Sequence, residues 1–88
     1  MAEYEIKDGV GIIPEGTTSI ESCAFQNCKE LKSVVIPKSV KTIGLCAFDN
    51  CTGLTKVEIP ESVKEIGWDA FIRCTSLSSI KIPKGVSS

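Results

Sequence analysis

Apolar residues recur along this chain with a period of 23 residues, and one proline in each period sets the register. The prolines are Pro14, Pro37, Pro60 and Pro83. Seven more columns keep the same spacing: Ile20, Ile43 and Ile66; Ala24, Ala47 and Ala70; Phe25, Phe48 and Phe71; Cys28, Cys51 and Cys74; Leu31, Leu54 and Leu77; Val34, Val57 and Ile80; Ile36, Ile59 and Ile82. A spacing shared by so many columns indicates a repeat protein, in which each unit packs on its neighbours.

Each period contains two predicted extended segments. Residues 54–60 end in strict alternation of apolar and polar side chains, which is typical of a half-buried strand. Pro60 ends this strand because proline lacks the N–H group that a sheet requires. After a turn, Val63 and Ile66 are expected to point inward from a second short extended segment.

A short helical segment is predicted at residues 68–74. Ala70 and Cys74 are four residues apart, so they share one face of one or two helical turns. Such a short helix is unstable alone and must be held by packing.

Stacking supplies that packing. Neighbouring units about 4.8 Å apart place equivalent residues in ladders and their strands in a parallel sheet. We expect Phe25, Phe48 and Phe71 to form the main ladder of the core.

The unit Ile-Pro-x-Ser-Val-x-x-Ile-Gly-x-x-Ala-Phe-x-x-Cys-x-x-Leu resembles the BspA-type, or Treponema-type, leucine-rich repeat over residues 11–86. The resemblance implies a leucine-rich-repeat solenoid of the α/β type, β-rich with short helical turns, in which three 23-residue coils carry a parallel sheet. We expect one domain over residues 1–88. Its repeats span approximately 14–36, 37–59 and 60–82, between partial coils at 4–13 and 83–88.

The resemblance also implies a function. Members of this family are surface or secreted proteins that act in adhesion, matrix binding or coaggregation. For this chain it implies a non-enzymatic binding module on the cell surface or outside the cell, with a host matrix or surface protein as partner. The alternative is a structural fragment that forms homo-oligomers through uncapped ends or edges of the solenoid.

The two ends of the array differ from its middle. Three positions near the first repeat depart from the pattern: Glu21 replaces the glycine of Gly44 and Gly67, Thr17 replaces the valine of Val40 and Val63, and Gly11 replaces Val34. We therefore expect a weaker and more exposed first coil, next to an N-terminal strand at residues 4–7. Residues 82–88 end in mid-repeat, which predicts an open last coil with Phe71 and Leu77 at its side.

Composition excludes several functions. The 88 residues carry a net charge of −1, which gives no electrostatic basis for binding nucleic acid or an anionic membrane. The chain has no histidine, the usual general base and the commonest metal ligand, so we expect no catalysis and no cofactor. No apolar run approaches the roughly 20 residues of a membrane span, and residues 1–5 show no signal peptide.

The five cysteines have three interpretations. Cys28, Cys51 and Cys74 lie in an apolar column, which favours buried free thiols. Cys23 and Cys46 form a second column and would be close enough in neighbouring coils for a disulfide. A zinc site is disfavoured, because Cys23 and Cys28 diverge by about 140° around a helical turn.

The candidate binding site is the sheet face that points away from the core. Its columns contain Ser33, Lys56 and Ser79, and then Val35, Glu58 and Lys81, with Ile12 before Val35. The alternative is an ordinary solvated face, because the strip lacks the Tyr, Trp and Arg residues that anchor tight interfaces.

A second candidate is an apolar patch formed by Leu45 and Trp68. These residues share a column with Ser22, and Trp68 is the only tryptophan. Either Trp68 packs over the outer turn of the last coil or it projects toward a partner. Of the two, we favour packing.

Overall fold

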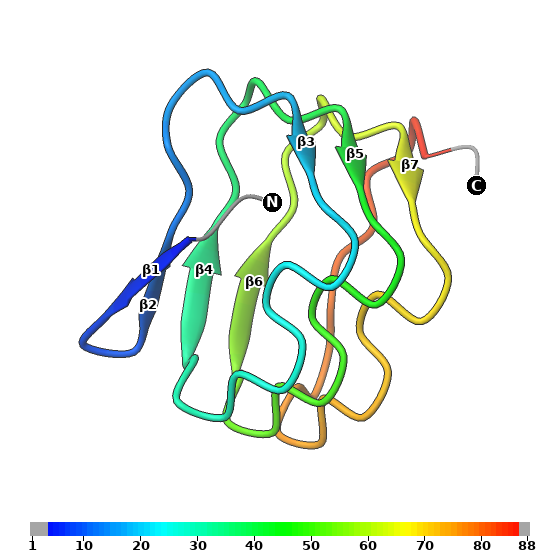
Figure 1. Cartoon of the computed structure of the whole chain (residues 1–88). Helices are drawn as coiled ribbons and strands as arrows, with labels where there is room; N and C mark the ends of the chain where they lie inside the picture. The colour runs from blue at the N-terminus through cyan, green and yellow to red at the C-terminus, as the bar shows by residue number, and fades with distance from the viewer. Residues whose placement is uncertain (1–3, 87–88) are drawn as a thin grey trace.

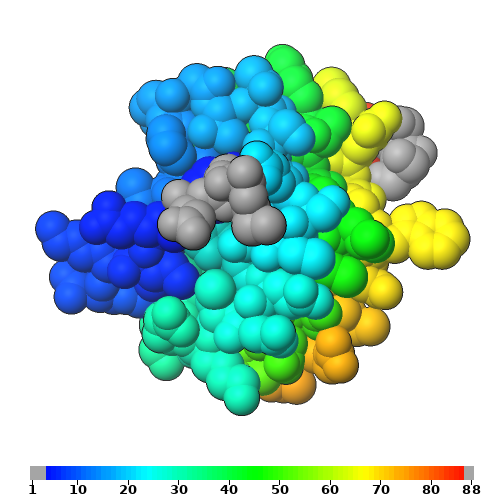
Figure 2. Space-filling view, viewed as in Figure 1, coloured from blue at the N-terminus to red at the C-terminus, as the bar shows by residue number. Residues whose placement is uncertain are grey.

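The computed structural model describes residues 4–86, which form seven short strands joined by turns (Figure 1). The strands are β1 (Glu5–Lys7), β2 (Val10–Ile12), β3 (Ser19–Ile20), β4 (Ser33–Val35), β5 (Thr42–Ile43), β6 (Lys56–Glu58) and β7 (Glu65–Ile66). They make two sheets, β1-β2-β4-β6 and β3-β5-β7. In Figure 2 the successive repeats appear as neighbouring bands of colour.

The 23-residue period is the register of both sheets. In the first sheet β2, β4 and β6 are parallel, and Val34 lies opposite Val57. In the second sheet Ile20 lies opposite Ile43, which lies opposite Ile66. The predicted leucine-rich-repeat fold with parallel strands is therefore confirmed, whereas the number of coils and the extent of the solenoid stay predictions.

The expected helical turns are wrong, because the described residues contain no helix. The segments after β3, β5 and β7 are successive β-turns, each with two left-handed residues four positions apart, as at Cys46 (φ 56°) and Asn50 (φ 63°). An α-helix needs φ near −63° at every residue. Ala47 N donates to Gly44 O, three residues back, whereas Phe48 N donates across to Ala70 O in the next repeat. The backbone therefore alternates between turn bonds and bonds to the neighbouring repeat.

The aromatic ladder expected from the sequence is the centre of the core. Phe25 and Phe48 are 1% and 0% exposed. Their ring centroids lie 5.2 Å apart, and Phe48 and Phe71 are 5.1 Å apart, each pair stacked within 10° of parallel. Around the rings pack the apolar columns of the pattern, including Ile20, Ile43, Leu31 and Leu54.

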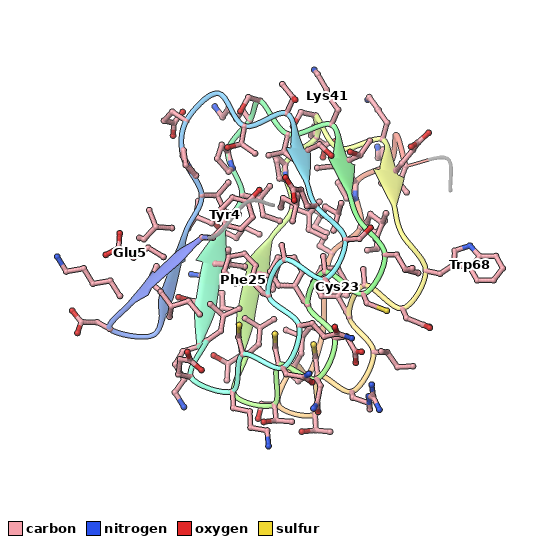
Figure 3. All side chains as sticks on the ribbon, in the orientation of Figure 1. Tyr4, Glu5, Cys23, Phe25, Lys41 and Trp68 are labelled. Carbon is pink, nitrogen blue, oxygen red and sulfur yellow. The ribbon has the colours of Figure 1, made fainter. Side chains whose placement is uncertain are left out.

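The first repeat is covered, contrary to the expectation of an exposed first coil. Tyr4 continues the aromatic ladder, with its ring 5.3 Å from that of Phe25 (Figure 3). The antiparallel hairpin of β1 and β2 brings Ile6 opposite Gly11 and against the core. A Cβ at Gly11 would lie 3.0 Å from Leu31 Cδ1 and 3.3 Å from the Phe25 ring, so glycine leaves the space that these side chains occupy.

Glu21 stands where the next two repeats have Gly44 and Gly67, and the neighbouring backbone explains this difference too. A Cβ at Gly44 would lie 2.5 Å from Ser22 N, and one at Gly67 would lie 2.5 Å from Leu45 N. Glycine is needed there because the backbone of the preceding repeat passes directly beside it. Glu21 follows β3, which is an edge strand of the second sheet in the described part of the chain.

The third repeat is the more open one. Phe71, Leu77 and Ile80 are only partly buried, whereas their equivalents Phe48 and Leu54 are 0% exposed. Among the described residues the first sheet ends at β6, so residues 79–81 follow the sequence pattern without forming a strand.

Candidate functional site

The outward side of the first sheet presents one alternate set of side chains from each strand. Gly11, Val34 and Val57 point toward the core, so their neighbours in the strands point to solvent. We name this surface the outer face. It consists of Glu5, Lys7, Val10, Ile12, Ser33, Val35, Lys56 and Glu58.

The outer face has an apolar middle and charged margins. Val10, Ile12 and Val35 are 36%, 43% and 62% exposed. On one side β1 contributes an acid and a base, Glu5 and Lys7, and on the other side β6 contributes Lys56 and Glu58. Figure 3 shows Glu5 projecting from β1. An apolar centre within a polar rim is the usual composition of a protein interface.

The structure brings together four of the six residues expected on this face. Ser33 is paired with Lys56, and Val35 with Glu58, in the register of the parallel strands. Ser79 and Lys81 are exposed but lie outside the sheets. They do not extend the face as strand residues, because the ladder of backbone hydrogen bonds stops at β6 in the described part of the chain.

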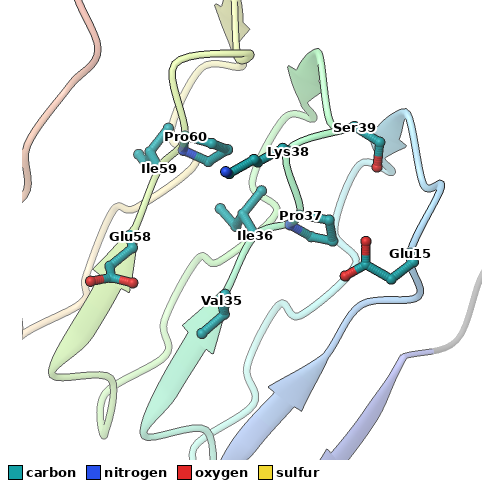
Figure 4. Close-up of a pocket in the computed structure, with 9 residues that line it drawn as sticks. All are labelled: Glu15, Val35, Ile36, Pro37, Lys38, Ser39, Glu58, Ile59 and Pro60. Atoms are coloured by element: carbon teal, nitrogen blue, oxygen red, sulfur yellow. The ribbon is translucent and has the colours of Figure 1, made fainter.

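A groove opens beside the outer face, at the carboxyl ends of β4 and β6 (Figure 4). Its volume is about 520 Å³. Nine residues line it: Glu15, Val35, Ile36, Pro37, Lys38, Ser39, Glu58, Ile59 and Pro60. Val35 and Glu58 belong to both the groove and the outer face, so the two form one continuous surface.

Sequence reasoning missed this groove, although its signal was present. Every strand of the first sheet that carries the repeat is followed by Ile-Pro, as in Ile36-Pro37 and Ile59-Pro60. Proline ends hydrogen bonding between neighbouring strands. The strand pairing therefore stops before these prolines, and the Ile-Pro pairs line the groove there.

The second candidate patch is exposed, so the packing interpretation of Trp68 was wrong. Trp68 is 84% exposed and Leu45, in the neighbouring repeat, is 49% exposed. The backbones at these positions are adjacent, because Cys46 N donates to Trp68 O at 3.0 Å. Figure 3 shows Trp68 projecting away from the molecule on the side opposite β1.

A shallow hollow of about 340 Å³ lies next to Trp68. It is lined by Thr42, Ile43, Gly44, Glu65, Ile66, Gly67 and Trp68 itself. The two glycines contribute only backbone atoms to its lining. Gly67 directly precedes Trp68 in the sequence, but the hollow itself could not be predicted, because it also depends on residues 42–44 of the neighbouring repeat.

The cysteine column is structural in its contacts. All five cysteines are free thiols in the structure. Cys51 Sγ donates to Phe25 O at 3.1 Å, and Cys74 Sγ donates to Phe48 O at 3.0 Å, so each thiol ties its repeat to the one before. Burial raises the pKa of Cys51 to about 12 and also raises that of Cys74. Protonated thiols are poor nucleophiles, so this column offers no reactive site.

Asp49 connects three repeats from a buried position. It is 3% exposed and accepts a hydrogen bond from Gln26 Nε2 at 2.9 Å. It also forms an ion pair with Arg73, whose Nη2 lies 2.9 Å from Asp49 Oδ2. The hydrogen bond from Gln26, together with the hydrogen bonds and charge of Arg73, lowers the pKa of Asp49 despite its burial. These contacts hold the carboxylate in place between the repeats.

Residues 4–86 offer neither a metal-binding cluster nor a membrane-spanning helix. No group of three or more cysteine, aspartate and glutamate side chains is placed to hold a metal ion. The same part of the chain has no helix that could cross a membrane.

Known proteins contain the same kind of repeat as this chain. The family model described as "BspA type Leucine rich repeat region (6 copies)" matches residues 10–88. The crystal structure of the T. pallidum leucine-rich-repeat protein TpLRR superposes with a TM-score of 0.81 at 30% identity, covering 96% of this chain and 48% of that one. A leucine-rich-repeat protein from Bacteroides ovatus gives 0.72 at 26% identity, over 98% of this chain and 30% of that one.

This chain thus spans about half of the first relative and less than a third of the second. No curated protein matches it.

Proposed function

The chain belongs to the family of BspA-type leucine-rich-repeat proteins, and from this premise we propose that it binds a protein partner through the outer face and the adjoining groove. Leucine-rich repeats are protein-interaction modules and typically non-enzymatic scaffolds. To this general role we add a specific binding surface, which is the outer face with its groove.

The exposure of Val35 is the observation that carries this proposal. It is the most exposed residue of the apolar middle of the outer face, at 62%, and it also lines the groove. A partner that covers Val35 would bury apolar surface on the sheet and in the groove together. Burial of apolar surface is the main favourable term in protein association.

The charged margins favour a partner with charges of both signs. Lys56 and Glu58 stand on β6, and Glu15 and Lys38 stand around the groove. Complementary charges at a rim contribute more to the rate and specificity of binding than to affinity. A mixed-charge protein surface fits these margins better than a polyanion, in line with the net charge of −1.

Within the family, the partner class is a host matrix or surface protein. BspA-type repeat proteins are generally surface or secreted proteins. We therefore place this module outside the cell or on its surface, as one domain of three 23-residue coils acting in adhesion.

Binding to a panel of purified extracellular-matrix proteins tests the proposal, with the 88-residue chain immobilised and its variants compared. Val35→Asp places a charge in the apolar middle and should weaken binding at least tenfold, while circular dichroism shows an unchanged fold. Lys56→Glu should slow association.

Lys81→Glu is the matched control, because this substitution makes the same change of charge at a residue outside the sheet. Equal binding by the Val35→Asp variant and the parent would refute the role of the outer face. Equal loss in the two lysine variants would show that only net charge matters.

Self-association through the last coil is the second candidate function. It is favoured by the partial burial of Phe71 and Leu77, where the equivalent residues of the second repeat are fully buried. Light scattering after size exclusion, over a concentration series, tests it. Open-ended growth that Leu77→Lys abolishes would support assembly, and a constant monomer mass would exclude it.

A further inference from the structure

Trp68 is the most exposed of the large apolar side chains in the described part of the chain. At 84% exposure, about 200 Å² of its surface is in water, taking the usual surface of a tryptophan side chain. So much apolar surface in water is unfavourable for an isolated chain, and all of it belongs to one side chain. In Figure 2 the yellow segment that contains Trp68 projects beyond the surface around it.

The hollow beside Trp68 is suited to a flat apolar group. Its lining includes the backbone of Gly44 and Gly67 together with Thr42 and Glu65. Its volume of about 340 Å³ is sufficient for an indole ring. Trp68 forms one border of this hollow and projects from it, so the side chain does not fill the space next to it.

We infer that two copies of this chain associate about a two-fold axis, with Trp68 of each copy seated in the hollow of the other. A projecting group and a hollow that lie side by side on one patch are self-complementary under two-fold rotation. Each copy then both donates and receives a tryptophan. The assembly stops at two copies, because Trp68 and the hollow of each copy are both occupied in the pair.

The neighbouring residues allow such an approach. Leu45 is 49% exposed and would meet the partner's indole ring as it enters the hollow. Glu65 is the charged residue that lines the hollow. In the pair, each Glu65 stands at the rim, where its carboxylate can remain in water.

The buried area predicts a weak dimer. About 200 Å² of Trp68 is roughly a quarter of the 800 Å² that each partner contributes to an interface of standard size. Two tryptophans in two hollows therefore form the centre of a small interface. A dissociation constant between about 10 μM and 1 mM is expected for such a contact.

Trp68 reports on its own burial, because it is the only tryptophan in the chain. The experiment measures tryptophan emission and sedimentation mass of the 88-residue chain from about 1 μM to 1 mM under reducing conditions. We expect the emission maximum to move to shorter wavelength over the same concentration range in which the mass doubles.

Two variants test the contribution of the indole ring and that of the hollow separately. Trp68→Ser places at this position the residue that Ser22 provides in the first repeat, so the fold accepts it, and the mass should stay monomeric. Glu65→Arg keeps Trp68 but extends a longer side chain over the hollow, and it should weaken the dimer at least tenfold with no blue shift at concentrations where the parent is paired.

Val35→Ser is the matched control, since it removes an exposed apolar side chain from the outer face and should leave the dimer unchanged. The inference is overturned by a monomer with exposed-tryptophan emission at every concentration, which would leave Trp68 to a foreign partner. A dimer that persists in the Trp68→Ser chain, or growth beyond two copies, would also overturn it and point to the ends of the array.

Discussion

The first and last phenylalanines of the aromatic ladder, Phe25 and Phe71, stand in the same register and are buried to different degrees. Phe25 is 1% exposed because Tyr4 stacks on its free side, with the centroids 5.3 Å apart. Phe71 stacks on Phe48 at 5.1 Å and remains partly buried. A repeat motif therefore specifies the direction of a side chain, whereas its burial depends on what stacks next to it.

The comparison extends to positions that deviate from the motif. Gly11 and Glu21 first suggested a weak repeat, yet each suits the end at which it stands. Gly11 leaves space for Phe25 and Leu31, and Glu21 follows β3, which is an edge strand of the second sheet in the described part of the chain. At these two positions the departure from the repeat consensus matches the residues and strands that lie next to it in the structure.

Removing the central ring should have the largest effect. Phe48→Ala is expected to cost about 3–5 kcal/mol, because Phe48 is 0% exposed and has a stacked ring on each side. A domain of this size has a total stability of about 5–10 kcal/mol, so cooperative unfolding in urea should be lost or reduced to a low midpoint.

Phe71→Ala is the comparison, and it should cost distinctly less. Its ring has one stacked partner and is already partly exposed. Equal losses in the two variants would mean that position in the stack does not determine the contribution of a ring.

Adding one methyl group between repeats should have the next largest effect. Gly44→Ala places a Cβ about 2.5 Å from Ser22 N, and overpacking of this kind costs about 1–3 kcal/mol. Glu21→Ala is the control at the edge of the same sheet, and its cost should stay within about 1 kcal/mol. Thermal melts of both variants measure the difference. A harmless Gly44→Ala change would show that the repeats can separate without loss.

Uncovering the first ring should have a smaller effect. Tyr4→Ala removes the ring stacked on Phe25 and should cost about 1–2 kcal/mol. Tyr4→Phe keeps the stack and removes only the hydroxyl group, which donates a long bond to Ser19 O at 3.5 Å and also interacts with the backbone of Glu21. It should stay within about 0.5 kcal/mol of the parent. If Tyr4→Phe were as destabilising as Tyr4→Ala, the hydroxyl group and not the ring would cover this end.

The smallest effect is confined to acid pH. The folded pKa of Asp49 is lowered by the hydrogen bond from Gln26 and by Arg73, so the ionised form is favoured in the folded chain. Its contribution to stability is complete above the ordinary aspartate pKa of about 3.9. It is lost as pH falls through the lower folded pKa.

Urea midpoints between pH 7 and pH 2 test this prediction. Asp49→Asn should flatten the acid part of the curve, whereas Asp69→Asn, which changes an exposed aspartate, should keep it. An unchanged acid curve in the Asp49→Asn chain would mean that other carboxylates cause the loss.

The sequence by itself determined the family, the parallel register and the inward columns. A 23-residue period aligns equivalent residues, and alternation within each strand then fixes which side chains face the core. The outer-face positions Ser33, Val35, Lys56 and Glu58 were predictable for the same reason.

Only the tertiary structure decided how the ends and turns are arranged. Ala70 and Cys74 suggested a helix, but bonds between repeats, such as Phe48 N to Ala70 O, favour turns with left-handed residues. Likewise the groove beside Val35, the covering by Tyr4 and the exposure of Trp68 depend on which backbone segment lies next to each residue. A local pattern contains no information about such neighbours, because they come from segments far apart in the sequence.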